Sequence, residues 1–265
     1  MSRSLAVITG ASSGIGLELA KRCARRDFDV VMVAEDAELI TSAEAVRGLG
    51  AQTETIRADL TEHDEVERVA REVQALGRPV DALLLNAGRG AGGQFVDGAE
   101  ETALADELAI VDLNCRSTVH LAKLLLPAMV ERGQGRVLIT SSIASAMPGT
   151  YQAVYNASKS FTQSFALAIR EELKDTGVTV TSLMPGPTET EFFLRARMGN
   201  TKVGASDKDS AAKVAEQGFD GMMSGSERVW GGGVASQLQG RTSRFVPDVL
   251  KAKMHAAMAK PGSAK

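Results

Sequence analysis

"TGASSGIG", residues 9–16, joins an apolar run at residues 5–9 to a segment with helical periodicity at residues 14–26. It contains three glycines, Gly10, Gly14 and Gly16. Glycine permits a tight turn and a close approach of the backbone to a pyrophosphate, and the free N–H groups at the start of the following helix attract its negative charge. The stretch therefore favours a nucleotide-binding loop between a first strand and a first helix, over the alternative of an ordinary glycine-rich turn.

The remainder of the chain alternates in the same way. Further apolar runs lie at residues 29–34, 53–58, 82–86, 136–141 and 178–184, and segments with helical spacing lie at about 36–48, 62–76, 100–113, 116–131 and 153–174. Runs without polar alternation are typical of strands buried on both faces of a sheet. Strands that alternate with helices pair in parallel through right-handed crossovers. We therefore expect an α/β fold, a single doubly wound domain over residues 1–265.

The sequence after residue 185 is less regular. A helix is expected at 207–223, a last strand at 227–233 and a helix at 246–259, whereas 189–206 has no clear period and is expected to form a loop or short helices. Residues 260–265 are expected to fray.

Composition excludes several classes of function. The net charge is −3 and no lysine–arginine run occurs, so a nucleic-acid partner is not expected. No stretch approaches the ~18 apolar residues of a membrane span, and the first apolar run is too short for a signal peptide, which predicts a cytoplasmic protein without a membrane partner. The three histidines, His63, His120 and His255, are scattered, so no metal site is expected.

Carboxylates follow the second and third strands. Glu35 and Asp36 lie about 20 residues beyond the glycines, where an acid can accept hydrogen bonds from the hydroxyls of an adenosine ribose. The alternative is that both acids only begin the next helix, because acids favour its N-terminal dipole. Asp59 and Leu60 end the third strand, where the adenine edge is expected.

A tyrosine and a lysine stand four residues apart in "AVYNASKS", residues 153–160. Positions i and i+4 share a helix face, so Lys159 is expected beside Tyr155. An ammonium near a phenol lowers the phenol's pKa and brings it towards proton exchange at working pH. Ser142, at the end of the strand at 136–141, is expected at the same sheet edge. The alternative is an exposed helix-surface pair.

These motifs together resemble the short-chain dehydrogenase/reductase family, over about residues 5–190. The matching segments are "TGASSGIG" (9–16), "DL" (59–60), "NAG" (86–88), Asn114 in "VDLNCRS", Ser142 in "TSSIAS", "YNASK" (155–159) and "PGPTET" (185–190). The resemblance implies a Rossmann-like domain with a seven-stranded parallel sheet flanked by helices. It also implies an NAD- or NADP-dependent oxidoreductase whose hydride chemistry belongs to the cofactor.

The resemblance also implies roles for single residues. Tyr155 would be the general acid/base, Ser142 would polarise the substrate oxygen, and Lys159 would lower the pKa of the tyrosine and bind the nicotinamide ribose. Asn114 would position a water that links Lys159 to solvent. The expected dinucleotide contacts are Gly10, Ser12, Ser13, Gly14, Ile15, Gly16, Glu35, Asp36, Asp59, Leu60, Asn86, Ala87, Gly88, Tyr155, Lys159, Pro185, Gly186 and Thr188.

The cofactor preference is predicted from two positions. Ser13 and Glu35 stand where NADP-preferring members of the family often carry a basic residue, which favours NAD over NADP. The acid common in NAD users would align with Ala34, so Glu35 or Asp36 would take its place. Arg57 remains available to a phosphate.

The segment at 189–225 is expected to bind the substrate. Phe192, Phe193, Met147 and Met198 indicate an apolar pocket, and Gln152 and Arg195 can meet a polar end of the substrate. The apolar face of 116–131 (Leu121, Leu124, Leu125 and Met129) is either core or the contact of a homodimer or homotetramer.

The predicted reaction interconverts a secondary alcohol and a ketone. Reduction of a 3-oxoacyl thioester is the alternative among enzymes. A non-catalytic regulator that binds a dinucleotide is the alternative outside them, although such a protein would be expected to lose the tyrosine or the lysine.

Overall fold

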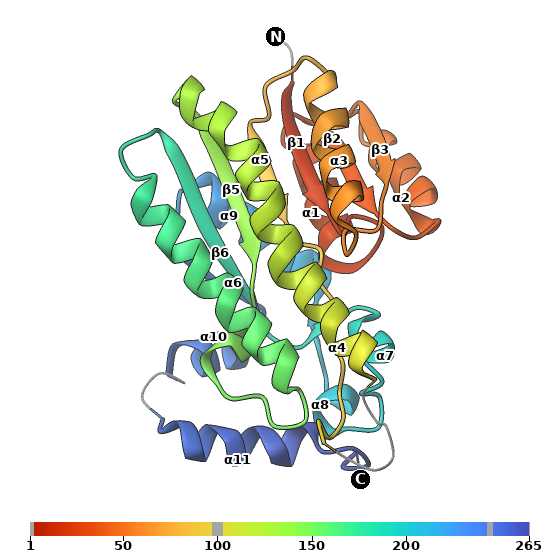
Figure 1. The fold of residues 1–265 in the computed structure, drawn as a ribbon, viewed down its shortest axis with the longest axis vertical. Coiled ribbons are helices and arrows are strands. Elements are labelled where there is room, and N and C mark those ends of the chain that lie inside the picture. Colours follow the sequence, from red (N-terminus) through yellow and green to blue (C-terminus); the bar gives the residue numbers. More distant parts are fainter. Residues whose placement is uncertain (1–2, 97–102, 243–245, 265) are drawn as a thin grey trace.

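The computed structural model describes residues 3–96, 103–242 and 246–264 and is built on a seven-stranded sheet (Figure 1). Its strands are β1 (Ser4–Thr9), β2 (Phe28–Ala34), β3 (Thr53–Arg57), β4 (Ala82–Leu85), β5 (Gly135–Thr140), β6 (Val178–Pro185) and β9 (Arg228–Gly231). They lie in the order β3-β2-β1-β4-β5-β6-β9, and each neighbouring pair is parallel. The expected seven-stranded parallel sheet is confirmed.

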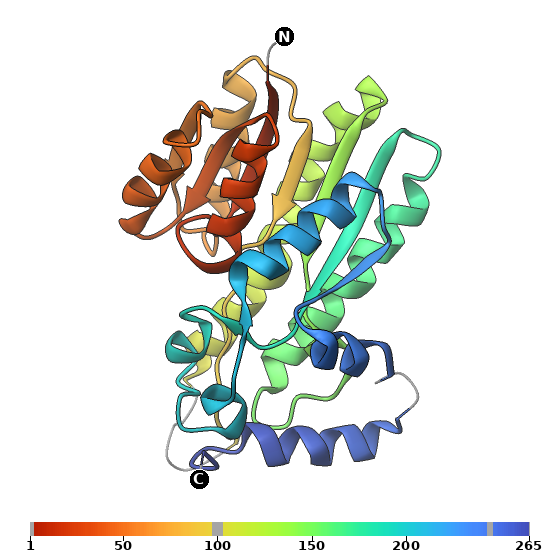
Figure 2. The same cartoon turned by 180° about the vertical axis from the view of Figure 1, so that it is seen from behind.

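Helices cover both faces of the sheet. The helices α1 (Gly14–Arg25), α2 (Glu38–Arg47) and α9 (Ala211–Met223) pack on one face, and α3 (His63–Ala75), α5 (Ser117–Arg132) and α6 (Ala153–Glu172) on the other (Figures 1 and 2). Every residue of β2 is consequently buried, which explains why its sequence, FDVVMVA, lacks polar alternation.

The long helical region before β5 departs from the expectation. Helix α4 (Leu104–Val111) runs through a π-helical turn (Asp112–Arg116) directly into α5, so the segments expected at 100–113 and 116–131 form one continuous helical rod; residues 97–102 lie outside the described part. Leu121, Leu125 and Met129 are buried in the core beneath α5. The apolar face of this helix is therefore core rather than an assembly surface.

The remaining elements gather beyond the carboxyl ends of the strands (Figure 1). They are the two-residue strands β7 (Thr188–Glu189) and β8 (Asp209–Ser210) and the helices α7 (Phe192–Arg195), α8 (Lys202–Ala205), α10 (Val234–Thr242) and α11 (Asp248–Ala259). The sequence pattern had not indicated α10. The tail was expected to fray, whereas the Ala264 amide donates to the Asn200 carbonyl at 3.0 Å and the Lys202 amide donates to Ser263 Oγ at 3.1 Å.

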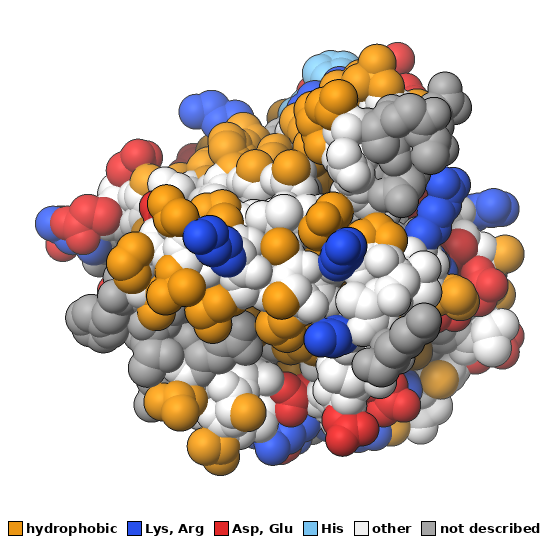
Figure 3. Space-filling model, turned by 90° about the horizontal axis from the view of Figure 1, so that it is seen from below, with side chains coloured by type: hydrophobic (Ala, Val, Ile, Leu, Met, Phe, Trp, Pro, Cys, Tyr) orange, Lys and Arg blue, Asp and Glu red, His pale blue; other side chains and the backbone are white. Residues whose placement is uncertain are grey.

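Helix α11 carries apolar side chains on opposite sides. Val249, Leu250 and Met254 are exposed. Figure 3 shows the end of the molecule that α11 covers, where apolar side chains mix with lysine and arginine. His255 and Ala259 are buried on the inner side. Within the described residues, we find no helix whose length and apolarity suit a membrane crossing.

Candidate active site

The glycine loop follows β1 where the strand order changes direction, between β1 and β4. Ligands of doubly wound folds bind outside the carboxyl ends of strands at such a point. Gly10 has a φ of +64°, which a residue with a side chain rarely adopts. A Cβ on Gly16 would lie 1.9 Å from the Gly10 carbonyl oxygen, so only glycine lets α1 begin this close to the loop.

A cleft of about 990 Å³ opens beside this loop at the carboxyl ends of the strands. All the residues expected to contact a dinucleotide line it: Gly10, Ser12, Ser13, Gly14, Ile15, Gly16, Glu35, Asp36, Asp59, Leu60, Asn86, Ala87, Gly88, Tyr155, Lys159, Pro185, Gly186 and Thr188. Ser142 lines it too, whereas Asn114 does not. The fold therefore brings widely separated motifs to one cavity.

The carboxylate of Asp36 is prepared for a hydrogen-bonding ligand. Ser12 Oγ donates to Asp36 Oδ2 at 2.9 Å, and the guanidinium of Arg195 lies 3.8 Å from the same oxygen. Asp36 Oδ1 is buried with no hydrogen-bond partner among the described residues. A buried acceptor without a partner is costly, so this oxygen fits a ribose hydroxyl. Glu35 is exposed, and its main-chain carbonyl accepts a hydrogen bond from Arg57 Nε at 2.8 Å.

Asn86 ties together the ends of three strands. Its side-chain amide donates to the Thr9 and Gly10 carbonyls at 3.2 and 3.4 Å, and its Oδ1 accepts from Thr140 Oγ1 at 3.0 Å. These bonds fix the wall of the cleft between β1, β4 and β5. The amide therefore holds the shape of this part of the cleft.

Tyr155 lies near the start of α6, in the wall of the cleft. Burial raises the pKa of Tyr155 to about 12, and a hydrogen bond with the Ser142 side chain acts in the opposite direction. The sequence instead predicts that Lys159 lowers this pKa. Here Lys159 Nζ lies 6.0 Å from the centroid of the tyrosine ring and donates to the Thr140 carbonyl at 3.0 Å, so its charge is directed towards the backbone of β5.

Lys159 is itself buried, and this burial lowers its pKa to about 8. A Cβ on Gly88 would lie 3.1 Å from Lys159 Nζ and 3.2 Å from Asn114 Oδ1. The absence of a side chain at Gly88 thus leaves room for the Lys159 ammonium in the cleft and for the Asn114 amide behind its wall.

Asn114 stands in the π-helical turn behind the wall of the cleft and is buried. Its Oδ1 accepts from the Arg89 amide at 2.9 Å, and its Nδ2 donates to the Arg89 carbonyl at 2.9 Å and to Ser158 Oγ at 2.8 Å. π-helical turns occur frequently at functional sites. The observed bonds fasten the loop after β4 to α6; the water-positioning role stays a prediction.

Ser142 follows β5 and caps a short 3₁₀ helix (Ile143–Ala146). Its Oγ accepts from the Ala144 amide at 3.1 Å, and the residue is 8% exposed. The neighbouring Ser141 Oγ donates to the Lys159 carbonyl at 2.8 Å. These contacts hold Ser142 opposite the helix that carries Tyr155.

Aromatic and apolar side chains line the cleft beside Tyr155. The rings of Tyr155 and Phe192 have centroids 5.0 Å apart, and Phe193, Met147, Gln152 and Arg195 also line the cleft, as expected. Met198 does not line it, because this side chain is fully buried in a small core with Ala196 and Ala259.

Helix α11 adds residues that sequence reasoning missed. His255, Met258 and Ala259 line the cleft, as does Val203 of α8. His255 Nδ1 lies 2.8 Å from the Thr150 carbonyl, which can only accept, so Nδ1 carries the proton. Burial lowers the pKa of His255 despite this bond, so the neutral ring leaves Nε2 as an acceptor. No local signal marks these residues, because only the tertiary fold places the end of the chain here.

Comparison with known proteins agrees with this geometry. The family model for short chain dehydrogenases matches residues 4–200. The chain is 32% identical to the ketoacyl reductase HetN of Nostoc sp. (78% of this chain, 72% of the relative) and 34% identical to serine 3-dehydrogenase of Agrobacterium fabrum (73% and 76%). A short-chain dehydrogenase from Sphingobium yanoikuyae, solved with NADPH, superposes with a TM-score of 0.78 at 28% identity, covering 85% of this chain and 87% of that one. The chain therefore belongs to the short-chain dehydrogenase/reductase family, the NAD(P)-dependent oxidoreductases that transfer a hydride between a nicotinamide cofactor and an alcohol or ketone.

Proposed function

We propose that this oxidoreductase interconverts a secondary alcohol and a ketone with Tyr155 as general acid/base. One observation carries the proposal: Ser142, Tyr155 and Lys159 line the same cleft as the glycine loop. A regulator that only senses the dinucleotide would have no use for a half-buried tyrosine beside a buried lysine.

Each residue has a different proposed role at the substrate oxygen. The bound nicotinamide supplies or accepts the hydride. Ser142 Oγ, held by its contact with the Ala144 amide, hydrogen-bonds the substrate oxygen. Tyr155 gives its proton to that oxygen during reduction and takes it back during oxidation. Lys159, one helical turn further on, is proposed to hydrogen-bond the nicotinamide ribose and to return the proton to solvent through a water at Asn114.

The direct test is a fluorescence titration of the protein with NADH and with NADPH, followed by a screen of ketones and alcohols. We expect both binding and turnover of at least one secondary alcohol or ketone. Failure of both dinucleotides to bind would overturn the proposal.

The two directions are expected to differ in pH dependence. A pKa of about 12 keeps Tyr155 protonated at neutral pH, as donation to a ketone requires, whereas oxidation of an alcohol needs the phenolate. We expect kcat/KM for oxidation to rise between pH 7 and pH 10 by up to tenfold per unit, and kcat/KM for reduction to stay flat between pH 6 and pH 7.5. Initial rates in both directions, in buffers of constant ionic strength, measure this. An oxidation rate that falls as the pH rises would contradict it.

Asp36 is proposed to favour NAD over NADP, because its carboxylate, with Oδ1 buried and without a partner among the described residues, can bind the ribose hydroxyls and repels a 2′-phosphate. We expect Asp36→Asn to weaken NADH binding by roughly tenfold and NADPH binding by less, since hydrogen bonds to charged groups contribute about 1.5–3 kcal/mol. Glu44→Gln, at an exposed acid of α2 that does not line the cleft, is the control. Equal losses for both cofactors would contradict the role, because a carboxylate that binds the ribose hydroxyls and repels a 2′-phosphate must affect the two cofactors differently.

The proposed substrate has a compact polar centre with an apolar body. The aromatic pair Phe192 and Phe193 packs edge-to-face beside Tyr155, and Met147 and Met258 add apolar lining. His255 Nε2 offers an acceptor to a second hydroxyl or amide of the substrate. A 3-oxoacyl thioester is the second candidate, favoured by the likeness to a ketoacyl reductase and by Arg195 at the cleft. The screen above separates the two when it includes an acetoacetyl thioester.

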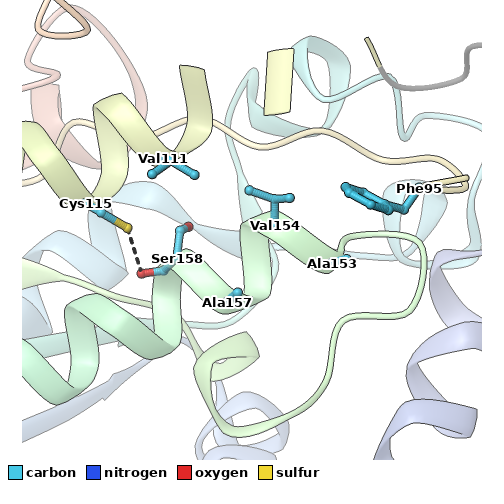
Figure 4. Close-up of a pocket in the computed structure, with 7 residues that line it drawn as sticks. All are labelled: Phe95, Val111, Cys115, Ala153, Val154, Ala157 and Ser158. Atoms are coloured by element: carbon cyan, nitrogen blue, oxygen red, sulfur yellow. Dashed lines mark hydrogen bonds between the residues drawn. The ribbon is translucent and has the colours of Figure 1, made fainter. Parts of the chain in front are cut away.

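The proposed assembly is a homodimer through α4 and α6. On α4, Leu104, Leu108 and Val111 form one exposed apolar stripe, and Phe161 is exposed on α6. Between the helices lies an apolar pocket lined by Phe95, Val111, Cys115, Ala153, Val154, Ala157 and Ser158, which Figure 4 shows. A two-fold axis brings one such patch against its own copy. The exposed side of α11 would supply the second contact of a tetramer.

The cytoplasmic location of the protein also remains a prediction.

A single charge is expected to break this dimer. Leu108 is 53% exposed, and Ile40, on α2, is 54% exposed. We expect Leu108→Glu to halve the mass measured by light scattering after size exclusion, because a charge in an apolar interface is left desolvated. Ile40→Glu, matched in exposure, should leave the mass unchanged. A wild-type protein that is monomeric at micromolar concentration would contradict the assembly.

A further inference from the structure

Outside the active site, the fold assembles two histidines and a glutamate that are distant in the sequence. His63 begins α3, Glu67 lies one turn further along the same helix, and His120 projects from α5. Their ligand atoms all lie within 4.8 Å of one another. The sequence analysis expects no metal site, because only the packing of α3 against α5 brings His120 to the other two residues.

The three side chains of this cluster contact one another directly. His120 Nε2 lies 2.8 Å from Glu67 Oε1, so one proton joins the ring to the carboxylate. The rings of His63 and His120 stack with centroids 4.6 Å apart and an interplanar angle of 26°. Arg68, the neighbouring cation on the helix, is engaged by Glu65 and Glu72. Its charge is thus already compensated and does not compete for Glu67.

We infer that His63, Glu67 and His120 bind a divalent transition metal ion, with Zn²⁺ the best match. Two imidazoles and one carboxylate are a recurrent ligand set for zinc, with water in the fourth position. Ligand atoms around a tetrahedral zinc lie roughly 3.3 Å apart, given bonds of about 2.0–2.2 Å. The ligand atoms must therefore approach one another by at most about 1.5 Å, and the exposed side chain of His63 is free to turn.

The proposed ion would clip α3 to α5. The metal takes the place of the proton between His120 Nε2 and Glu67, so its binding releases a proton. The bound ion would also hold the first residue of α3, His63, which lies four residues after Asp59 at the proposed adenine side of the cleft. The inference itself does not depend on the proposed reaction, because it concerns binding of the metal alone.

The test is a titration of untagged, chelator-treated protein with Zn²⁺ against a chromophoric chelator. We expect one ion per chain, and affinity at least tenfold lower for His63→Ala, for Glu67→Gln and for His120→Ala. Asp64→Asn, an exposed acid beside His63, should bind as the wild type does. At Zn²⁺ one hundredfold above the dissociation constant, the melting temperature should rise by roughly 5 °C, an increase lost in His120→Ala.

Two results would overturn the inference. One is stoichiometric binding that survives in the variant with both His63→Ala and His120→Ala. The other is wild-type protein that binds no more Zn²⁺ than this double variant does. Circular dichroism establishes that each variant is folded, and Glu67→Gln keeps both imidazoles, so a misfolded histidine variant does not decide the result.

Discussion

Tyr155→Phe is expected to lower kcat by roughly 10²–10⁴-fold, the range that general acid–base groups contribute. The substitution removes only the hydroxyl. The ring stays in place beside Phe192, 5.0 Å away between centroids, so the shape of the cleft is kept. We therefore expect the dissociation constants for NADH and NADPH to change less than threefold. Single-turnover kinetics with saturating cofactor measure the chemical step, and fluorescence titration measures binding.

The chain contains its own control for this substitution. Tyr151 is its other tyrosine, four residues earlier, and it packs against the small core that contains Met198. Tyr151 does not line the cleft. Tyr151→Phe should therefore retain wild-type turnover within about twofold, because general acid catalysis needs the proton within hydrogen-bond reach of the substrate. A Tyr155→Phe variant that turns over as fast as Tyr151→Phe would exclude Tyr155 as the acid.

The strands were predictable because of how they are buried. A parallel strand such as β2, covered by helices on both faces, must be apolar throughout, and that pattern is visible in a single sequence. The position of the cleft was predictable as well, because the residues that follow parallel strands all lie at the same edge of the sheet. The residues Gly10, Asp36, Asn86 and Tyr155 belong to short sequence motifs that follow strands of this sheet, so the sequence alone predicts that they meet.

The features that sequence reasoning missed depend on long-range packing. The sequence contains a helix at the end of the chain, but nothing local places His255 in the wall of the cleft. Met198 reads as a pocket residue, yet it is buried in a core that forms only when α11 docks. The pKa of Tyr155 could not be predicted from the sequence either. The spacing of Tyr155 and Lys159 is readable, whereas the depth of burial that raises this pKa to about 12 is not.

Gly16→Ala is expected to weaken dinucleotide binding by roughly 100-fold. The new Cβ would lie 1.9 Å from the Gly10 carbonyl oxygen and 2.6 Å from Asn86 Nδ2. The first of these atoms is backbone, so the start of α1 must move away from the loop. That movement takes the helix N–H groups out of line with the phosphates, and two lost charge-assisted hydrogen bonds at about 1.5 kcal/mol each correspond to this factor. Titration with NADH measures the loss.

Measuring both stability and affinity for NADH distinguishes a loss of binding from a general loss of folding in Gly16→Ala. Overpacking costs about 1–3 kcal/mol, so Gly16→Ala should still fold, with a melting temperature lower by several degrees. The control is Gly48→Ala, since Gly48 has a φ of −58° and a Cβ there would meet its nearest atom at 3.5 Å. That variant should keep both affinity and stability. If Gly16→Ala loses stability but binds NADH as the wild type does, the phosphates are held elsewhere, and the cleft would have to bind the dinucleotide in another orientation.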